Sequence, residues 1–110
     1  MYSFAVNCAF ISNSAANGHA GAINVYEDSN YTYSPNCNFI NNIAGEYGGA
    51  ICVETRSVYS FAENCTFLNN SAINHNGGAV FTNTDSNYTN SSNCQFINNI
   101  ADEYGGAICT

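Results

Sequence analysis

The sequence predicts an all-β fold, a parallel β-helix of about four coils with 28 or 29 residues in each coil. Three observations lead to this prediction. A short sequence motif that contains a cysteine recurs along the chain, and we call it the cysteine phrase. A second motif, the glycine phrase, recurs at the same spacing. In addition, fixed apolar positions alternate with variable polar ones. A repeat of this length is typical of stacked coils. A solenoid of this kind offers an extended surface rather than one pocket.

The first phrase predicts a strand whose inward side chains stack from coil to coil. Its cysteines stand 29, 28 and 29 residues apart, at Cys8, Cys37, Cys65 and Cys94. Two residues after each cysteine stand Phe10, Phe39, Phe67 and Phe96. Six residues before each stand Tyr2, Tyr31, Tyr59 and Tyr88. Because these offsets are even, one face of an extended chain carries all three ladders, with about 4.8 Å between coils.

The next positions predict a corner and then a bend. Five residues after each repeat cysteine stand Asn13, Asn42, Asn70 and Asn99. Asn tolerates the left-handed backbone of a sharp corner, and stacked amides can pass hydrogen bonds between coils. Two residues further on, every coil has an alanine, and this small residue predicts a tight bend at Ala15, Ala44, Ala72 and Ala101.

The glycine phrase predicts a loop that returns into another strand. It reads Gly-Gly-Ala-Ile/Val in three coils, with Ala20 replacing the first glycine in the other. A glycine pair permits positive φ or a close approach of two backbones. The unit therefore reads strand, corner, loop, strand, loop, strand. The coils are expected at residues 1–29, 30–57, 58–86 and 87–110, as one segment of a longer repeat protein.

The most variable stretches, 27–30, 54–57 and 83–87, are expected to be exposed loops that could bind a partner. Their candidate binding residues are Glu27, Asp28, Asn30, Arg56, Asp85 and Asn87. A longer period also runs through the chain, since residues 37–53 nearly repeat as 94–110, which is 57 residues later. Duplication of a block of two coils is the simplest account.

Composition excludes several classes of function. The formal net charge is −7 with a single basic residue, which rules out a nucleic-acid partner and disfavours anionic membrane surfaces. No apolar run reaches the length of a bilayer-spanning helix, and the first residues lack a signal peptide's pattern. Richness in Asn raises the alternative of a disordered tract. The regular recurrence of apolar positions argues against it.

The cysteines admit three interpretations. A zinc site is disfavoured because zinc sites usually have paired spacings such as Cys-x-x-Cys. Disulfides are disfavoured because cysteines stacked in adjacent coils have parallel side chains, which suit the disulfide torsion poorly. We therefore expect free thiols that act as small apolar groups. Cys52 and Cys109 alternate with Ile51 and Ile108, so one member of each pair should face out. An exposed Cys109 could pair with another molecule.

No catalytic, cofactor or metal residues are expected. Glu46 and Glu103 occupy equivalent slots but lie two coils apart, and Arg56 has no obvious acidic cluster. Glycosidase or lyase chemistry needs convergent acids, so these charges are assigned to solvated surface. His19 and His75 precede the glycine phrases, with Tyr47 and Tyr104 as their counterparts, and are assigned to packing or surface. No Ser/His/Asp or Cys/His arrangement follows from the spacing.

The pairing of Phe-x-x-Asn with Gly-Gly-Ala-Ile/Val resembles the repeats of chlamydial polymorphic outer membrane proteins, with related repeats in surface proteins of methanogens and trichomonads. The resemblance implies a right-handed parallel β-helix on the cell surface or outside the cell, used in adhesion. The expected function is thus a non-enzymatic, adhesin-like scaffold that presents loops to a protein or glycan of a host or neighbouring cell. A carbohydrate-active β-helix enzyme and a purely structural stalk remain the alternatives. Uncapped coil edges also predict end-to-end self-association.

Overall fold

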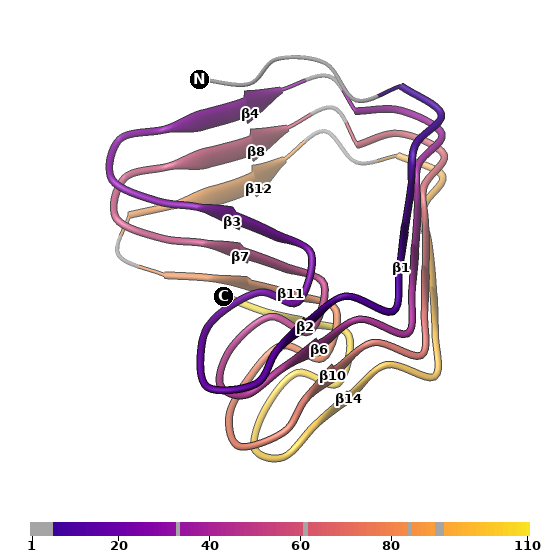
Figure 1. The fold of residues 1–110 in the computed structure, drawn as a ribbon. Coiled ribbons are helices and arrows are strands. Elements are labelled where there is room, and N and C mark those ends of the chain that lie inside the picture. Colours follow the sequence, from indigo (N-terminus) through magenta and orange to yellow (C-terminus); the bar gives the residue numbers. More distant parts are fainter. Residues whose placement is uncertain (1–5, 33, 61, 84, 90–91) are drawn as a thin grey trace.

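The computed structural model describes residues 6–32, 34–60, 62–83, 85–89 and 92–110. Throughout these residues the regular structure consists of short strands that pair in parallel with the coil before and the coil after. The predicted parallel β-solenoid is therefore confirmed, with a number of turns close to the predicted four (Figure 1). The described part of the chain contains no helix of the length and apolarity needed to cross a membrane.

The first strand of each coil carries the phenylalanine ladder. These strands form one sheet in the order β1 (Ala9–Ile11), β5 (Asn38–Ile40), β9 (Thr66–Leu68) and β13 (Gln95–Ile97). The register places each phenylalanine over the next. Neighbouring ring centroids are 4.9, 4.7 and 4.7 Å apart and the ring planes are nearly parallel. This spacing equals the separation of paired strands, so the rings stack because the backbones do.

A second strand follows where the sequence predicted only a bend, so the prediction of three strands per coil is wrong. The second strands are β2 (Ser14–Ala15), β6 (Ile43–Ala44), β10 (Ser71–Ala72) and β14 (Ile100–Ala101). Their alanines point inward and are fully buried in the middle coils. The small side chain is required here because the solenoid is narrow: the backbone of this strand runs beside the second glycine of the glycine phrase.

The third and fourth strands complete each coil. The third strands are β3 (Ile23–Val25), β7 (Ile51–Val53), β11 (Val80–Thr82) and β15 (Ile108–Cys109). The fourth strands are β4 (Asn30–Thr32), β8 (Val58–Ser60) and β12 (Asn87–Thr89). Tyr31, Tyr59 and Tyr88 stack along the fourth strands, with centroids 4.8 and 5.4 Å apart. Tyr2, the other member predicted for this ladder, lies outside the described residues.

The corner after the first strand differs from the prediction in one respect. Positive φ falls on the residue before the ladder asparagine, at Ser12, Asn41, Asn69 and Asn98. The ladder asparagines lie one residue later, and in the middle coils they are fully buried. The preceding residue takes the left-handed turn, and the ladder asparagine directs its amide into the stack.

The two glycines of the repeated phrase serve different purposes. The first has φ of 64° at Gly48 and 72° at Gly77, a conformation that glycine adopts without steric cost. Ala20 adopts the same conformation with φ of 58°, so the coil that lacks this glycine keeps the same path. The second glycine lies against the backbone of the neighbouring coil.

The core is a column inside the coils. Its members include Cys37, Phe39, Ile51, Tyr59 and Phe67, none of them more than marginally exposed. A second, smaller cluster lies outside this column and consists of Ala20, Cys52 and Phe81, flanked by Tyr47 and Cys109. This outer cluster exists because the loops between the second and third strands fold back along the third strands (Figure 1).

Candidate functional site: a histidine between two carboxylates

Strand β7 carries buried residues on both of its faces. Ile51 and Val53 point into the main core and Cys52 points outward, so one member of the Ile51/Cys52 pair faces out, as the alternation predicted. Cys52 is nevertheless fully buried, because Ala20, Tyr47 and Phe81 cover it. The outward-facing cysteine is therefore not exposed to solvent, because the loops of coils one and two form a second layer over the strand.

Glu54 lies on the same outward side as Cys52 and is only 8% exposed. The sequence predicted an exposed loop from residue 54 to residue 57, and this is wrong at both ends, since Ser57 is also fully buried. Ser57 belongs to a serine ladder: its hydroxyl accepts from the backbone N–H of Ser29 at 3.1 Å, and its own N–H donates to the Ser86 hydroxyl at 3.1 Å. The buried serines therefore satisfy backbone groups at the turn.

His19 joins two carboxylates from the neighbouring coil. Its Nδ1 lies 2.6 Å from Glu54 Oε2, and its Nε2 lies 2.7 Å from Glu46 Oε2. Cys52 Sγ lies 4.0 Å from the same Nδ1. Glu46 is more exposed than Glu54, with 42% of its side chain accessible against 10%. The imidazole ring therefore links coil one to coil two at a half-buried position.

The electrostatic setting of His19 favours positive charge. Partial burial on its own lowers the pKa of His19, but the hydrogen bonds and negative charges of Glu54 and Glu46 together outweigh it, so the pKa is raised above its usual value. Burial, reinforced by the nearby Glu54 carboxylate, raises the pKa of the Cys52 thiol strongly. A protonated His19 therefore places its positive charge between two carboxylates. Independently of charge, His19, Cys52 and Glu54 lie close enough together to be potential metal ligands.

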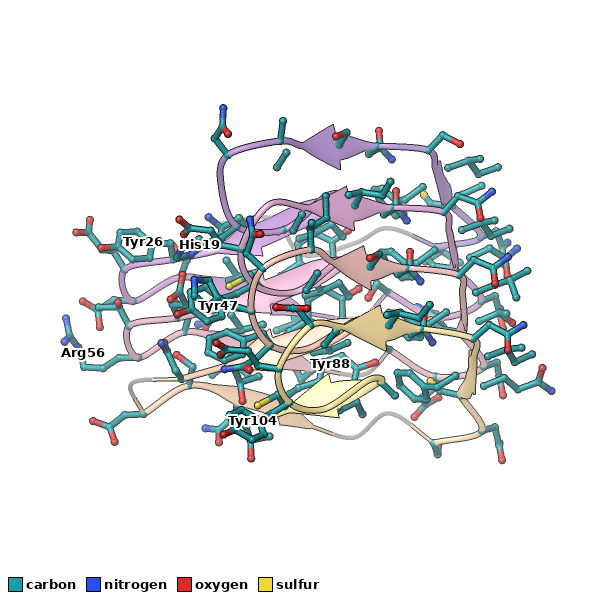
Figure 2. The ribbon with its side chains drawn as sticks, turned by 90° about the horizontal axis from the view of Figure 1, so that it is seen from below. His19, Tyr26, Tyr47, Arg56, Tyr88 and Tyr104 are labelled. Carbon is teal, nitrogen blue, oxygen red and sulfur yellow. The ribbon has the colours of Figure 1, made fainter. Side chains whose placement is uncertain are left out.

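Aromatic rings extend this cluster along the stack. His19 meets Tyr47 edge to face at 5.1 Å, and Tyr47 stacks on His75 at 4.8 Å. Figure 2 shows His19, Tyr47 and Tyr104 following one another down the same side of the coils. The loop contacts are packing contacts, as the sequence suggested, but the assignment of His19 and His75 to one slot is wrong. The backbone N–H of Gly48 donates to Asn76 O, so the residue at the same position as Tyr47 in the next coil is Asn76. His75 therefore lies one residue before this position, and its carbonyl oxygen accepts from the backbone N–H of Glu103.

The predicted loop residues separate into two groups. Glu27, Asp28, Arg56 and Asp85 lie at the turns between third and fourth strands and are exposed or extend from the edge. Asn30 and Asn87 do not lie in loops, because they pair with Val58 as the first residues of β4 and β12.

No acidic cluster at Arg56 was evident from the sequence, and the structure gives Arg56 one acidic partner, Asp28. Its Nε and one terminal nitrogen donate to the two carboxylate oxygens of Asp28, at 2.7 and 2.8 Å. The hydrogen bond from Arg56 holds the pKa of Asp28 below its usual value. Both side chains are more than half exposed, so the pair orders the turns and adds little to the free energy of folding.

The ladder cysteines Cys8, Cys37, Cys65 and Cys94 are free thiols. Cys37 and Cys65 are buried, whereas Cys8 and Cys94 in the outer coils are partly exposed. Their thiols donate to backbone carbonyls, as from Cys65 Sγ to Ser34 O at 3.2 Å. Each sulfur thus fills space inside the corner of its coil.

The cluster around His19 was not evident from the sequence, because its members are far apart in the chain. His19 and Cys52 are 33 residues apart, one coil plus a few positions. Alternation along residues 51–54 could have placed Cys52 and Glu54 on one face. Nothing in the spacing indicated that the loop carrying His19 would fold over that face. The two carboxylates do not flank an open cleft of the kind a glycosidase requires, because the imidazole fills the space between them.

The comparison with family models gives three matches, to residues 36–54, 64–83 and 93–110, all to the Chlamydia polymorphic membrane protein repeat. Each match begins at or just before the cysteine phrase and runs through the glycine phrase into the third strand. Searches among curated proteins and among solved structures gave no match. The three matched segments cover just over half of the chain and each lies within one structural coil, so the chain belongs to the Chlamydia polymorphic membrane protein repeat family.

Proposed function

We propose that this chain is a non-enzymatic, adhesin-like surface segment whose solenoid presents a row of turn side chains to a protein or glycan on a host or neighbouring cell. Membership of a membrane-protein repeat family supports a location at the cell surface. The observation that carries the proposal is the backbone of the turns between third and fourth strands.

These turns hold large polar side chains where glycine would be less strained. Glu27 and Asp28 have φ of 51° and 58°, and Thr55 and Arg56 in the next coil have φ of 55° and 59°. The left-handed conformation costs a non-glycine residue about 1 kcal/mol or more. The chain nevertheless places acidic, hydroxyl and basic groups there. Such a pattern is expected where the side chains themselves have a use.

The turns also form a continuous edge. The backbone N–H of Asp28 donates to Thr55 O at 2.9 Å, so successive turns lie one above another. Asp85, with φ of 61°, continues the row in the third coil. Arg56 extends from this edge in Figure 2. An acidic row interrupted by one cation, on a rigid support, suits recognition of a basic or polar surface by charge and hydrogen bonding.

The test replaces the turn side chains while preserving the turn. One variant changes Glu27→Asn with Asp28→Gly and Thr55→Asn with Arg56→Gly, because Asn-Gly favours two successive positive φ values. A matched control changes Asn38→Ser and Thr66→Ser on the outward face of β5 and β9. Beads coated with each chain are applied to cultured epithelial cells and to immobilised glycans.

The turn variant should keep or raise the unfolding midpoint while binding falls several-fold, and the control should bind like the parent. Binding equal in all three chains, or no binding above beads with an unrelated protein, would overturn the adhesive role and leave a structural stalk. Release of soluble sugars from polysaccharides by the purified chain would instead establish the enzyme alternative.

A further inference from the structure

We propose that His19, Cys52 and Glu54 form a zinc site that fastens coil one to coil two, a role that does not depend on the adhesive function. The three potential ligand atoms, His19 Nδ1, Cys52 Sγ and a Glu54 carboxylate oxygen, all lie within 4.8 Å of one another. They come from a loop and from the outward face of β7 and its continuation, 33 and 35 residues apart in the chain.

The distances from His19 Nδ1 to Cys52 Sγ and to Glu54 Oε2 reach tetrahedral values after small movements. Zinc binds nitrogen and carboxylate oxygen at about 2.0 Å and thiolate sulfur at about 2.3 Å, which places tetrahedral ligand atoms about 3.3 to 3.7 Å apart. The Sγ–Nδ1 distance is 4.0 Å and the Oε2–Nδ1 distance is 2.6 Å. Sulfur must therefore approach the ring by a few tenths of an ångström, and the carboxylate must withdraw by somewhat less than 1 Å. Both shifts are within the reach of side-chain rotation.

Glu46 completes the arrangement behind the ring. Its carboxylate lies 2.7 Å from Nε2, the nitrogen on the far side of the imidazole from Cys52 and Glu54. A metal-binding histidine typically donates its second ring N–H to a carboxylate, which fixes both the tautomer and the ring orientation. With the Nε2 proton donated to Glu46, the lone pair of Nδ1 is directed at the thiol and at Glu54.

The environment favours zinc over a hard cation. A sulfur, an imidazole nitrogen and one carboxylate suit zinc, whereas calcium and magnesium require oxygen ligands. Cys52 is fully buried and Glu54 is 8% exposed, while His19 keeps 29% of its side chain accessible. The buried side supplies a dry wall, and the accessible side of His19 faces the solvent that would supply the ion and a water as fourth ligand.

The site differs from its neighbour along the stack. His75 lies 3.5 Å from Glu103, and these two side chains are more exposed, at 37% and 46%. Cys109 occupies the slot of Cys52 two coils later, through the register of β7, β11 and β15. His75 and Cys109 therefore provide matched controls of the same chemistry.

Binding replaces protons with metal. The ligands must be deprotonated, so zinc displaces the proton of the Cys52 thiol and any proton on His19 Nδ1, and these pass to the buffer. No oxidation or reduction accompanies the exchange. Because the ligands belong to adjacent coils, the bound ion stabilises the folded chain relative to the unfolded one.

The experiment uses the full chain, reduced with a non-chelating phosphine and freed of metal with a chelator. Zn²⁺ is titrated against a competing colorimetric chelator, and Co²⁺ is added separately to observe a thiolate-to-cobalt charge-transfer band. The test variants are His19→Gln, Cys52→Ser and Glu54→Gln, and the controls are His75→Gln and Cys109→Ser. A further variant, Glu46→Gln, keeps the hydrogen bond to Nε2 but removes the negative charge.

The parent should bind one equivalent of zinc with a rise in unfolding temperature. Each ligand variant should weaken binding at least tenfold, Glu46→Gln should weaken it about tenfold, and both controls should remain within twofold. The cobalt band should vanish in Cys52→Ser and persist in Cys109→Ser. Absence of zinc binding, equal binding by Cys52→Ser, or loss in the controls would overturn the site. The unfolding midpoint of each variant, measured with chelator present, identifies any variant that fails to fold. If another ligand variant fails to fold, the zinc affinity of Glu54→Gln decides whether the site exists.

Discussion

Asn42 and Asn70 use every hydrogen-bonding atom of their side-chain amides. The Oδ1 of Asn70 accepts from both the backbone N–H and the Nδ2 of Asn42, each at 3.0 Å. The Nδ2 of Asn70 donates to Asn99 Oδ1 and to Phe39 O, each at 2.9 Å. Both residues are fully buried, so each amide substitutes for water at the corner of its coil.

Replacement of a middle asparagine should be severe. Asn70→Ala leaves two buried donors of Asn42 without an acceptor, at about 1–3 kcal/mol each, so we expect a loss of about 3–5 kcal/mol in the free energy of unfolding. Asn13→Ala is the control. Asn13 is exposed and donates to only one neighbour, so water can replace it and the loss should be about 1 kcal/mol or less. Urea unfolding measures both, and equal losses would contradict the ladder.

Thiol reactivity should divide the six cysteines into two classes. Burial raises the pKa of Cys65 to about 12, and burial likewise raises the pKa of Cys37 and Cys52. Thiol reagents attack the thiolate, which these residues rarely form at neutral pH. In the native, metal-free chain Cys8, Cys94 and Cys109 should react first, and the other three only after unfolding in urea. Mass spectrometry of the alkylated chain identifies the sites, and uniform native reactivity would contradict the burial.

At the scale of elements, the width of each coil is set by the second glycine of the repeated phrase. A Cβ built on Gly49 would lie 2.5 Å from the backbone nitrogen of Ser71, and closer still to the carbonyl oxygen of Gly78. Gly21 and Gly78 meet the backbone of their neighbours in the same way. Because backbone atoms cannot rotate away, this slot admits no side chain.

Gly49→Ala should therefore destabilise the chain by about 3 kcal/mol, as overpacking against fixed atoms does. Gly18→Ala is the matched control, because an added Cβ there meets no atom within 4 Å and no positive φ is involved. Its effect should stay within about 0.5 kcal/mol. Thermal unfolding of both chains measures the difference. Similar midpoints would show that the strands are not packed as closely as described.

The sequence allowed the inward-facing strands to be predicted, since even offsets from each cysteine reveal which side chains share a face. It could not reveal β2 and its equivalents, because two-residue strands show no alternation to detect. The burial of Glu54 and Ser57 was also beyond prediction. Their composition is that of a surface loop, and only the fold-back of residues 16–22 over β7 and the serine ladder at the turn bury them. Candidate site residues that depend on such loop placement require the structure.

At the scale of the molecule, the described strands form sheets whose outermost members are paired on one side. Among the described strands, one sheet terminates at β1 and β13, and another at β3 and β15. Open edges of this kind pair readily with another chain. Opposing this, each copy carries a formal charge of −7, so copies repel one another at long range.

We therefore expect end-to-end association that strengthens with salt, because ions screen the repulsion while leaving strand pairing intact. Sedimentation velocity over a tenfold range of concentration, at low and high ionic strength, should show species larger than the monomer that increase with both. A single monomeric species under every condition would show that the terminal coils are protected.

The most direct test of the fold, on which both proposals depend, is whether like side chains stack once per coil in solution. With phenylalanine labelled, nuclear Overhauser spectra should show contacts between the rings of Phe39 and Phe67, whose centroids are 4.7 Å apart, and between those of Phe67 and Phe96. Phe39→Leu should remove the first contact and leave the second. Rings of Phe39 and Phe67 that show no mutual contact in a folded chain would contradict the stacked-coil account.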